Sequence, residues 1–146
     1  MYQTFTYSPL DRVYYDGKTK DILPKELELM DIDRLFIVSS STISKKTDEI
    51  DKIKDILGKK FVGIFDSCEE HSPLENVVEC AKKIKSTRPD MILTVGGGTP
   101  IDTVKVSQLC LTLGIFSSAE LKKISGKIQN VNSVSYTHLT LPTRIF

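Results

Sequence analysis

The chain has few of the residues that several protein classes need. Its 146 residues include three cysteines and two histidines. Cys68, Cys80 and Cys110 lie far apart and form no CxxC pair, so they fit reduced thiols better than a disulfide framework. Two histidines are too few for a histidine-rich metal cage. These counts predict a protein of the cytoplasm, where thiols stay reduced.

An excess of charge of one sign and long apolar runs are also missing. Lys and Arg number 20 against 19 Asp and Glu, a net charge of +1. This balance excludes a polybasic nucleic-acid arm or an acidic tail as the main functional device. The sequence has no run of about 18 apolar residues and no apolar segment near its start, so neither a membrane span nor a secretory signal is expected. We expect a small-molecule partner, with no nucleic acid and no membrane.

Apolar runs and helical patterns alternate along the middle of the chain. Three continuous apolar runs, Leu35 to Ser39, Phe61 to Phe65 and Met91 to Val95, predict strands that are buried on both faces. Apolar residues at helical spacing lie between and after these runs. The alternation predicts an α/β fold, a Rossmann-like parallel sheet with right-handed crossovers and helices on both faces.

Turn and cap signals add local predictions around these elements. Two short aromatic runs, at residues 5–9 and 12–17, are expected to pair as a hairpin. Pro24 is expected to open a brief helix. Ser72 and Thr99 each precede a proline and stand three residues before an acidic residue, which predicts that both cap helices.

Three consecutive glycines follow the third predicted strand. Gly96, Gly97 and Gly98 have no Cβ, so a phosphate can approach their backbone N–H groups closely. The first turn of the next helix adds unpaired N–H groups and the positive end of its dipole, and Thr99 can donate its hydroxyl. The pattern is neither GxGxxG nor GxxxxGK[ST]. Phosphate binding is the favoured interpretation, and a tight turn without a ligand is the alternative.

The segment VGGGTPIDTVK (Val95 to Lys105) resembles the GGGSxxDxxK motif of iron-containing alcohol dehydrogenases. The FTY start, the IVSSS strand end and the segment FDSCEEHSPLENVVE are also similar to the amino-terminal half of that family. The FD…HSP part of this segment is similar to the FDG…HTP stretch of maleylacetate reductases. The resemblance covers about residues 2 to 125. It implies a dinucleotide-binding α/β domain, followed in the family by a helical metal-binding domain that is missing here.

The resemblance also implies a binding site for NAD or NADP. Gly97, Gly98 and Thr99 would contact the pyrophosphate, and Asp102 would lie close to the nicotinamide. Many members carry an acidic residue after the first strand, whereas Ser39 to Ser41 stand there in this chain, which makes NADP admissible. The alternative is that the serines form an ordinary polar loop. The expected cofactor contacts are Gly96, Gly97, Gly98, Thr99, Asp102 and Ser40.

No catalytic and no metal-binding residue is expected in this chain. The family's iron is held mainly by the helical domain, and His71 has no second histidine at ligand spacing. We therefore expect this chain to be inactive. The full-length enzyme, expected to be a homodimer, would transfer hydride between nicotinamide and a small alcohol, aldehyde or maleylacetate-like substrate. A fragment of a glycerol dehydrogenase-like or dehydroquinate synthase-like zinc enzyme, or a stand-alone nucleotide-binding module, remains an alternative.

The last thirteen residues differ in character from the rest of the chain. The run VSYTHLTLPTR (Val134 to Arg144) resembles one translated frame of a transposase-type sequencing adapter. We therefore expect a native domain over residues 1–133 and a non-native tail over residues 134–146; the alternative is a genuine strand. Even an unselected run can pair with an exposed sheet edge, because pairing needs mainly free backbone N–H and C=O groups.

Deleting residues 134–146 is expected to change the free energy of unfolding by no more than about 0.5 kcal/mol, because side chains that were not selected for this core pack poorly. Urea denaturation of the full chain and of residues 1–133 measures the difference. A loss of several kcal/mol would instead identify the tail as a genuine element.

Overall fold

The computed structural model describes residues 12–128 and 143–145. Its helices are α1 (Thr19–Leu29), α2 (Ser41–Lys46), α3 (Glu49–Leu57), α4 (Leu74–Thr87), α5 (Gly98–Leu113) and α6 (Ser118–Ile128), with a 3-10 turn, η1 (Gly58–Lys60). Its strands are β1 (Leu35–Ser40), β2 (Phe61–Cys68), β3 (Met91–Val95) and β4 (Thr143–Ile145). All pair in parallel in the order β2-β1-β3-β4, which confirms the predicted α/β class.

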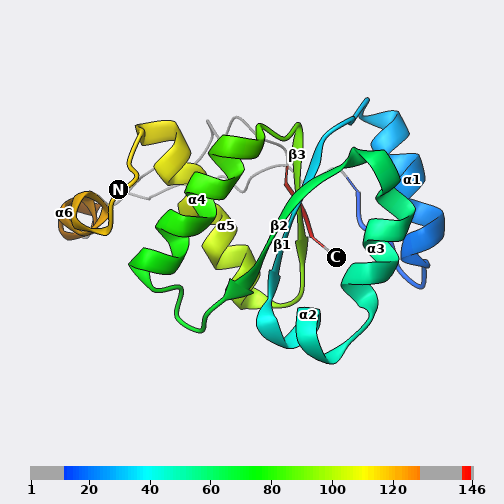
Figure 1. The fold of residues 1–146 in the computed structure, drawn as a ribbon, viewed down its shortest axis with the longest axis horizontal. Coiled ribbons are helices and arrows are strands. Elements are labelled where there is room, and N and C mark those ends of the chain that lie inside the picture. The colour runs from blue at the N-terminus through cyan, green and yellow to red at the C-terminus, as the bar shows by residue number, and fades with distance from the viewer. Residues whose placement is uncertain (1–11, 129–142, 146) are drawn as a thin grey trace, which may run out of the picture.

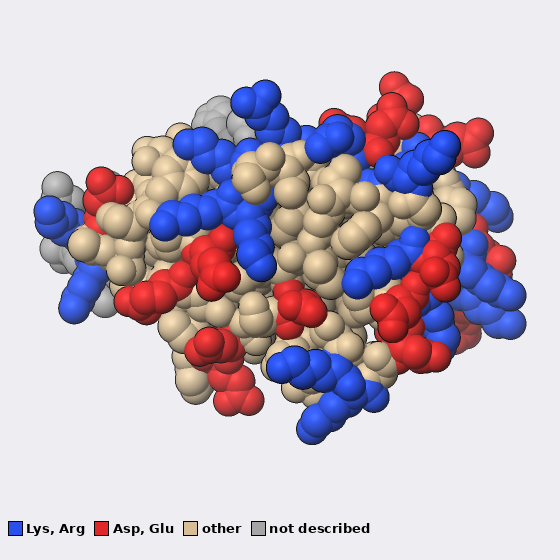
Figure 2. Space-filling view, viewed as in Figure 1, with Lys and Arg blue, Asp and Glu red and all other residues tan. Residues whose placement is uncertain are grey.

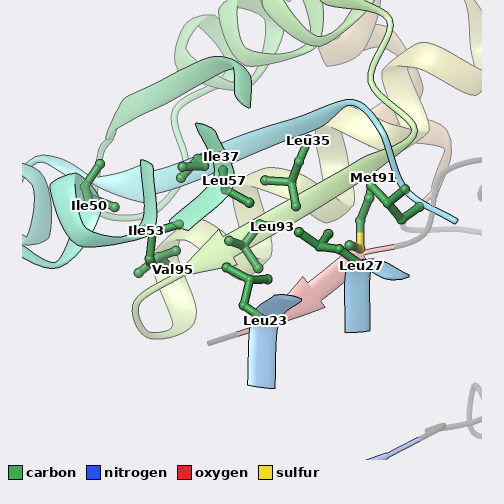
Figure 3. Close-up of a cluster of buried hydrophobic side chains, with 11 residues drawn as sticks. Leu23, Leu27, Leu35, Ile37, Ile50, Ile53, Leu57, Met91, Leu93 and Val95 are labelled. Atoms are coloured by element: carbon green, nitrogen blue, oxygen red, sulfur yellow. The ribbon is translucent and has the colours of Figure 1, made fainter. Parts of the chain in front are cut away.

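Helices cover both faces of the sheet, with α1 and α3 on one side and α4 and α5 on the other (Figure 1). Successive side chains of a strand point to opposite faces. Leu35 and Ile37 of β1 therefore join the cluster beneath α1 and α3 (Figure 3), and Phe36 and Val38 join the cluster beneath α4 and α5. Burial on both faces explains why β1 is a continuous apolar run.

The second strand is longer and less buried than its sequence predicts. It extends to Cys68, and only Phe65 and Cys68 of its residues are fully buried. The expectation of burial on both faces is wrong for β2, because this strand lies at the edge of the sheet and pairs only with β1. An apolar run cannot by itself distinguish an edge strand from a central one.

The predicted amino-terminal hairpin is wrong where the structure describes it. Residues 12–17 form no strand, and residues 5–9 lie outside the described range. Arg12 and Tyr14 instead donate hydrogen bonds to the carboxylate of Glu26, a buried residue of α1. A buried carboxylate needs such donors, so the segment with Arg12 and Tyr14 packs against α1.

Glycine and proline residues lie near several helix boundaries. Gly58 and Gly114 end α3 and α5 with positive φ values of 54° and 68°, which glycine adopts without strain. Pro24 lies inside α1, which begins at Thr19, so the expectation that it opens the helix is wrong. Pro24 is the sixth residue of α1, beyond the first turn in which N–H groups lack a partner, so the helix forgoes one backbone hydrogen bond there.

Charges of both signs are spread over the surface, and Figure 2 shows them interspersed across one face. Within the described part of the chain, no helix combines the length and the apolar character that crossing a membrane requires.

Gly63→Ala is expected to destabilise the fold by about 1–3 kcal/mol, because overpacking forces neighbours to move. A Cβ at Gly63 would lie 2.9 Å from Cε2 of Phe36 and 3.2 Å from Cγ2 of Thr87. Urea denaturation measures the change, with Ser67→Ala, an exposed position of the same strand, as the control. Equal stability of the two variants would contradict the close packing of β2 against β1.

Candidate functional site

The strand order creates a crevice at one edge of the sheet. The connection from β1 leads to β2 on one side, and the connection from β3 leads to β4 on the other. In open α/β sheets, ligands bind outside the carboxyl ends of adjacent strands whose connections diverge in this way. Ser39 of β1 and Val95 of β3 are partners there, and the Ser39 hydroxyl donates a hydrogen bond to the Val95 carbonyl oxygen at 2.9 Å.

A cleft of about 350 Å³ occupies this position. Its three walls are the start of α2, the end of β2 with the following turn, and the start of α5. The lining residues are Ser40, Ser41, Thr42, Cys68, Glu69, Glu70, Gly97, Gly98, Thr99 and Pro100. A larger hollow of about 570 Å³ lies between the start of α1 and α3, but no strand residue lines it. The topology therefore favours the smaller cleft as the functional site.

Four of the six residues predicted to contact a cofactor meet in this cleft: Ser40, Gly97, Gly98 and Thr99. Gly96 immediately precedes them and joins β3 to α5. Asp102 lies in the first turns of α5, is exposed, and is not part of the lining. The prediction that residues 96–99 connect a parallel strand to a helix amino terminus is confirmed.

The three glycines have different tasks. Gly96 adopts a φ of +130°, which L side chains rarely adopt, and a Cβ there would lie 3.2 Å from Cγ of Pro100. At Gly97 and Gly98 a Cβ would meet nothing within 4 Å. Gly96 is therefore required by the turn itself, whereas Gly97 and Gly98 leave open space in the cleft that a ligand can fill.

The start of α5 provides donors for an anion. The helix begins at Gly98 with Gly97 as its N-cap, so the prediction that Thr99 caps the helix is wrong. The sharp turn at Gly96 brings the backbone into helical conformation before Thr99 is reached. The N–H groups of the first turn have no acceptor within the helix, and the positive end of the dipole lies there too. This combination suits a phosphate.

The wall after β1 carries hydroxyl groups. Ser39 is fully buried within the strand, and the Ser40 side chain accepts a hydrogen bond from the Ile43 N–H at 3.4 Å, which caps α2. Both serines thus have the structural roles of a polar strand-to-helix connection. Ser40, Ser41 and Thr42 nevertheless face the cleft, and none of the three is acidic.

Sequence reasoning missed the third wall, which is formed by Cys68, Glu69 and Glu70. No sequence motif predicts that these residues line the cleft, because tertiary contacts set the conformation of their turn. The buried Asn76 amide donates to the Ser67 carbonyl oxygen at 2.8 Å, and its oxygen accepts from the Glu69 N–H at 3.3 Å.

A further expectation for this region is wrong. Ser72 does not cap α4, because its φ of 43° is left-handed and the N-cap is Pro73. Asp66 is half-buried in β2 and accepts a hydrogen bond from the Ser44 hydroxyl at 2.7 Å. His71 is an exposed turn residue.

The three thiols are buried and free. Burial raises the pKa of Cys68 to about 11 and that of Cys80 to about 12, and it also raises the pKa of Cys110. All three are therefore protonated at neutral pH and are poor nucleophiles. In residues 12–128 and 143–145, no three His, Cys, Asp or Glu residues are grouped so that they could hold a metal ion.

The sequence of the chain is similar to that of known proteins. The sequence profile of the family described as iron-containing alcohol dehydrogenase matches residues 11–143. A dehydrogenase from Alternaria alternata is 32% identical over 102 residues, 69% of this chain and 26% of that protein. The chain thus spans about a quarter of the length of this curated relative.

Solved structures show the same fold. Maleylacetate reductase from Agrobacterium tumefaciens superposes with a TM-score of 0.60 at 19% identity, over 73% of this chain and 30% of that chain. Sulfoacetaldehyde reductase from Bifidobacterium kashiwanohense, solved in complex with NAD+, gives a TM-score of 0.58 at 20% identity, over 65% of this chain and 25% of that chain.

Gly96→Ala is expected to destabilise the protein by about 1–3 kcal/mol, because alanine is strained at this φ. Gly98→Ala should leave stability unchanged or raise it by up to about 1 kcal/mol, because alanine is the better helix residue and meets open space. Urea denaturation of both variants checks the difference. Equal destabilisation by both would contradict the separate tasks of the two glycines.

Proposed function

The chain belongs to the iron-containing alcohol dehydrogenase family, and we propose that its cleft binds the pyrophosphate of NAD or NADP. The observation that carries this proposal is the open glycine turn, Gly96–Gly98, which leads into the amino terminus of α5 where the strand connections diverge. The NAD+ complex of sulfoacetaldehyde reductase, which has the same fold, supports it.

The start of α5 offers a pyrophosphate both space and hydrogen-bond donors. Space lies open at Gly97 and Gly98, where a Cβ would have no neighbour within 4 Å. The first-turn N–H groups of α5 would donate to the phosphate oxygens, and the Thr99 hydroxyl would add another donor. Pro100 has no N–H, so nothing is lost by placing it in this first turn. Nicotinamide, when bound, supplies the carbon that accepts or donates hydride.

Both NAD and NADP are proposed as ligands. Ser40, Ser41 and Thr42 form a wall of hydroxyl groups at the end of β1. A carboxylate at this place would bind a ribose and repel a 2′-phosphate, whereas hydroxyl groups accept either cofactor. Glu69 and Glu70 stand on another wall of the cleft.

For the complete protein we propose hydride transfer between nicotinamide and a small alcohol, aldehyde or maleylacetate-like substrate. A small molecule, and not nucleic acid or a membrane, is the proposed partner, and a homodimer in the cytoplasm is the proposed state. The described residues do not fit an iron ion, because they contain no group of three suitable ligands. No step of the reaction is therefore assigned to residues of this chain.

Gly98→Val tests the proposal. The unaltered chain should bind NADH and NADPH, measured by nucleotide fluorescence, and the variant should bind at least about tenfold more weakly, since its side chain enters the space meant for phosphate. Ala119→Val, an exposed first-turn residue of α6, is the matched control and should bind normally. Absence of binding by the unaltered chain, or equal affinity of Gly98→Val, would contradict the proposed site.

A further inference from the structure

Thr103 occupies a junction directly behind the cleft. Its side chain is fully buried in α5, one turn after Thr99, and it is not part of the cleft lining. Its hydroxyl oxygen lies 2.9 Å from the Thr99 carbonyl oxygen and 3.2 Å from the Ser72 hydroxyl oxygen. One hydroxyl thus connects the start of α5 with the loop that leads from β2 to α4.

The directions of these bonds follow from a count of protons. A threonine hydroxyl has one proton and two acceptor positions. The Thr99 carbonyl oxygen can only accept, so the Thr103 proton is donated there. Ser72 must then donate its own proton to Thr103. The arrangement gives both a donor and an acceptor partner to a group that burial has removed from water, and such a network favours one geometry over others.

The loop held by Ser72 is strained. His71 and Ser72 are consecutive non-glycine residues in the left-handed region, with φ of 62° and 43°. Such conformations persist only where surrounding contacts hold them. Asn76 fixes one end of this loop, and the Ser72–Thr103 bond fixes the other. Between the two lie Glu69 and Glu70, which line the cleft.

We propose that Thr103 is a positioning residue for the nucleotide cleft: its hydroxyl holds the start of α5 and the loop after β2, which belong to two of the three walls, in one fixed arrangement. This inference rests on the proposed function, because the arrangement matters only if the cleft binds a ligand. Thr103 itself touches no ligand in the proposed site. Its effect passes through Thr99 and the loop before α4.

Three variants of the full chain separate this role from general stability. Thr103→Val keeps the shape and removes the hydroxyl, and Thr103→Ser keeps the hydroxyl. Thr112→Val is the matched control, because Thr112 makes the same bond to the carbonyl four residues earlier, 2.9 Å to Gln108, at an exposed position of α5 away from the cleft. NADH affinity, thermal unfolding and hydrogen exchange of the Glu69–Ser72 amides are measured for each.

Thr103→Val should bind NADH about tenfold more weakly, a change of roughly 1.4 kcal/mol, and the Glu69–Ser72 amides should exchange faster. Thr103→Ser should restore both properties, and Thr112→Val should alter neither. Normal NADH affinity in Thr103→Val, or an equal loss in Thr112→Val, would overturn the proposal. If the unaltered chain binds no NADH, the proposed function fails and the positioning role fails with it, whereas unchanged loop exchange in Thr103→Val would overturn the role of Thr103 alone.

Discussion

The parallel pairing of β1 with β2 on one side and β3 on the other is the constraint from which the other features follow. Parallel strands require crossover connections, and right-handed crossovers to opposite sides of β1 place helices on both faces. The same pairing brings the carboxyl ends of three strands to one edge. Connections that diverge from β1 and β3 leave a crevice between them, so the site exists because of the strand order before any side chain is considered.

Neighbouring residues in this crevice have different roles in forming a binding site. Gly96 adopts the backbone conformation that makes the turn, and Gly97 and Gly98 keep the cleft open. The helix that follows contributes backbone donors that no side chain has to supply. The walls around this backbone site carry the hydroxyl and carboxyl groups that a ligand meets beyond its phosphates.

Sequence reasoning succeeded where the determinant is local. The run Met91 to Val95, the glycines and the proline after them define a strand, a turn and a helix within a dozen residues, and the structure has all three.

Sequence reasoning failed mainly where contacts with distant residues determine the local conformation. Arg12 and Tyr14 donate hydrogen bonds to Glu26 of α1 and do not form a hairpin, because a buried carboxylate requires donors. Ser72 carries the sequence signature of a helix cap, but its left-handed loop is held by a contact with Thr103 of α5. Thr99 carries the same signature and fails for a local reason, because the turn at Gly96 starts the helix before Thr99 is reached. Glu69 and Glu70 reach the cleft on a loop that Asn76 and Thr103 hold, and nothing in the spacing of these residues reveals those contacts.

The interface between α4 and α5 shows how such distant contacts keep the glycine turn in place. Thr103 and Ser107 stand one turn apart on α5 and therefore share a face. Thr103 bonds with Ser72 just before α4, and the Ser107 hydroxyl donates to the Val77 carbonyl oxygen at 3.1 Å within α4. Apolar packing between the helices is less directional than hydrogen bonding, and the two buried hydroxyl bonds are satisfied in only one register. Because the glycine turn is continuous with α5, fixing that register also fixes the turn relative to the walls of the cleft.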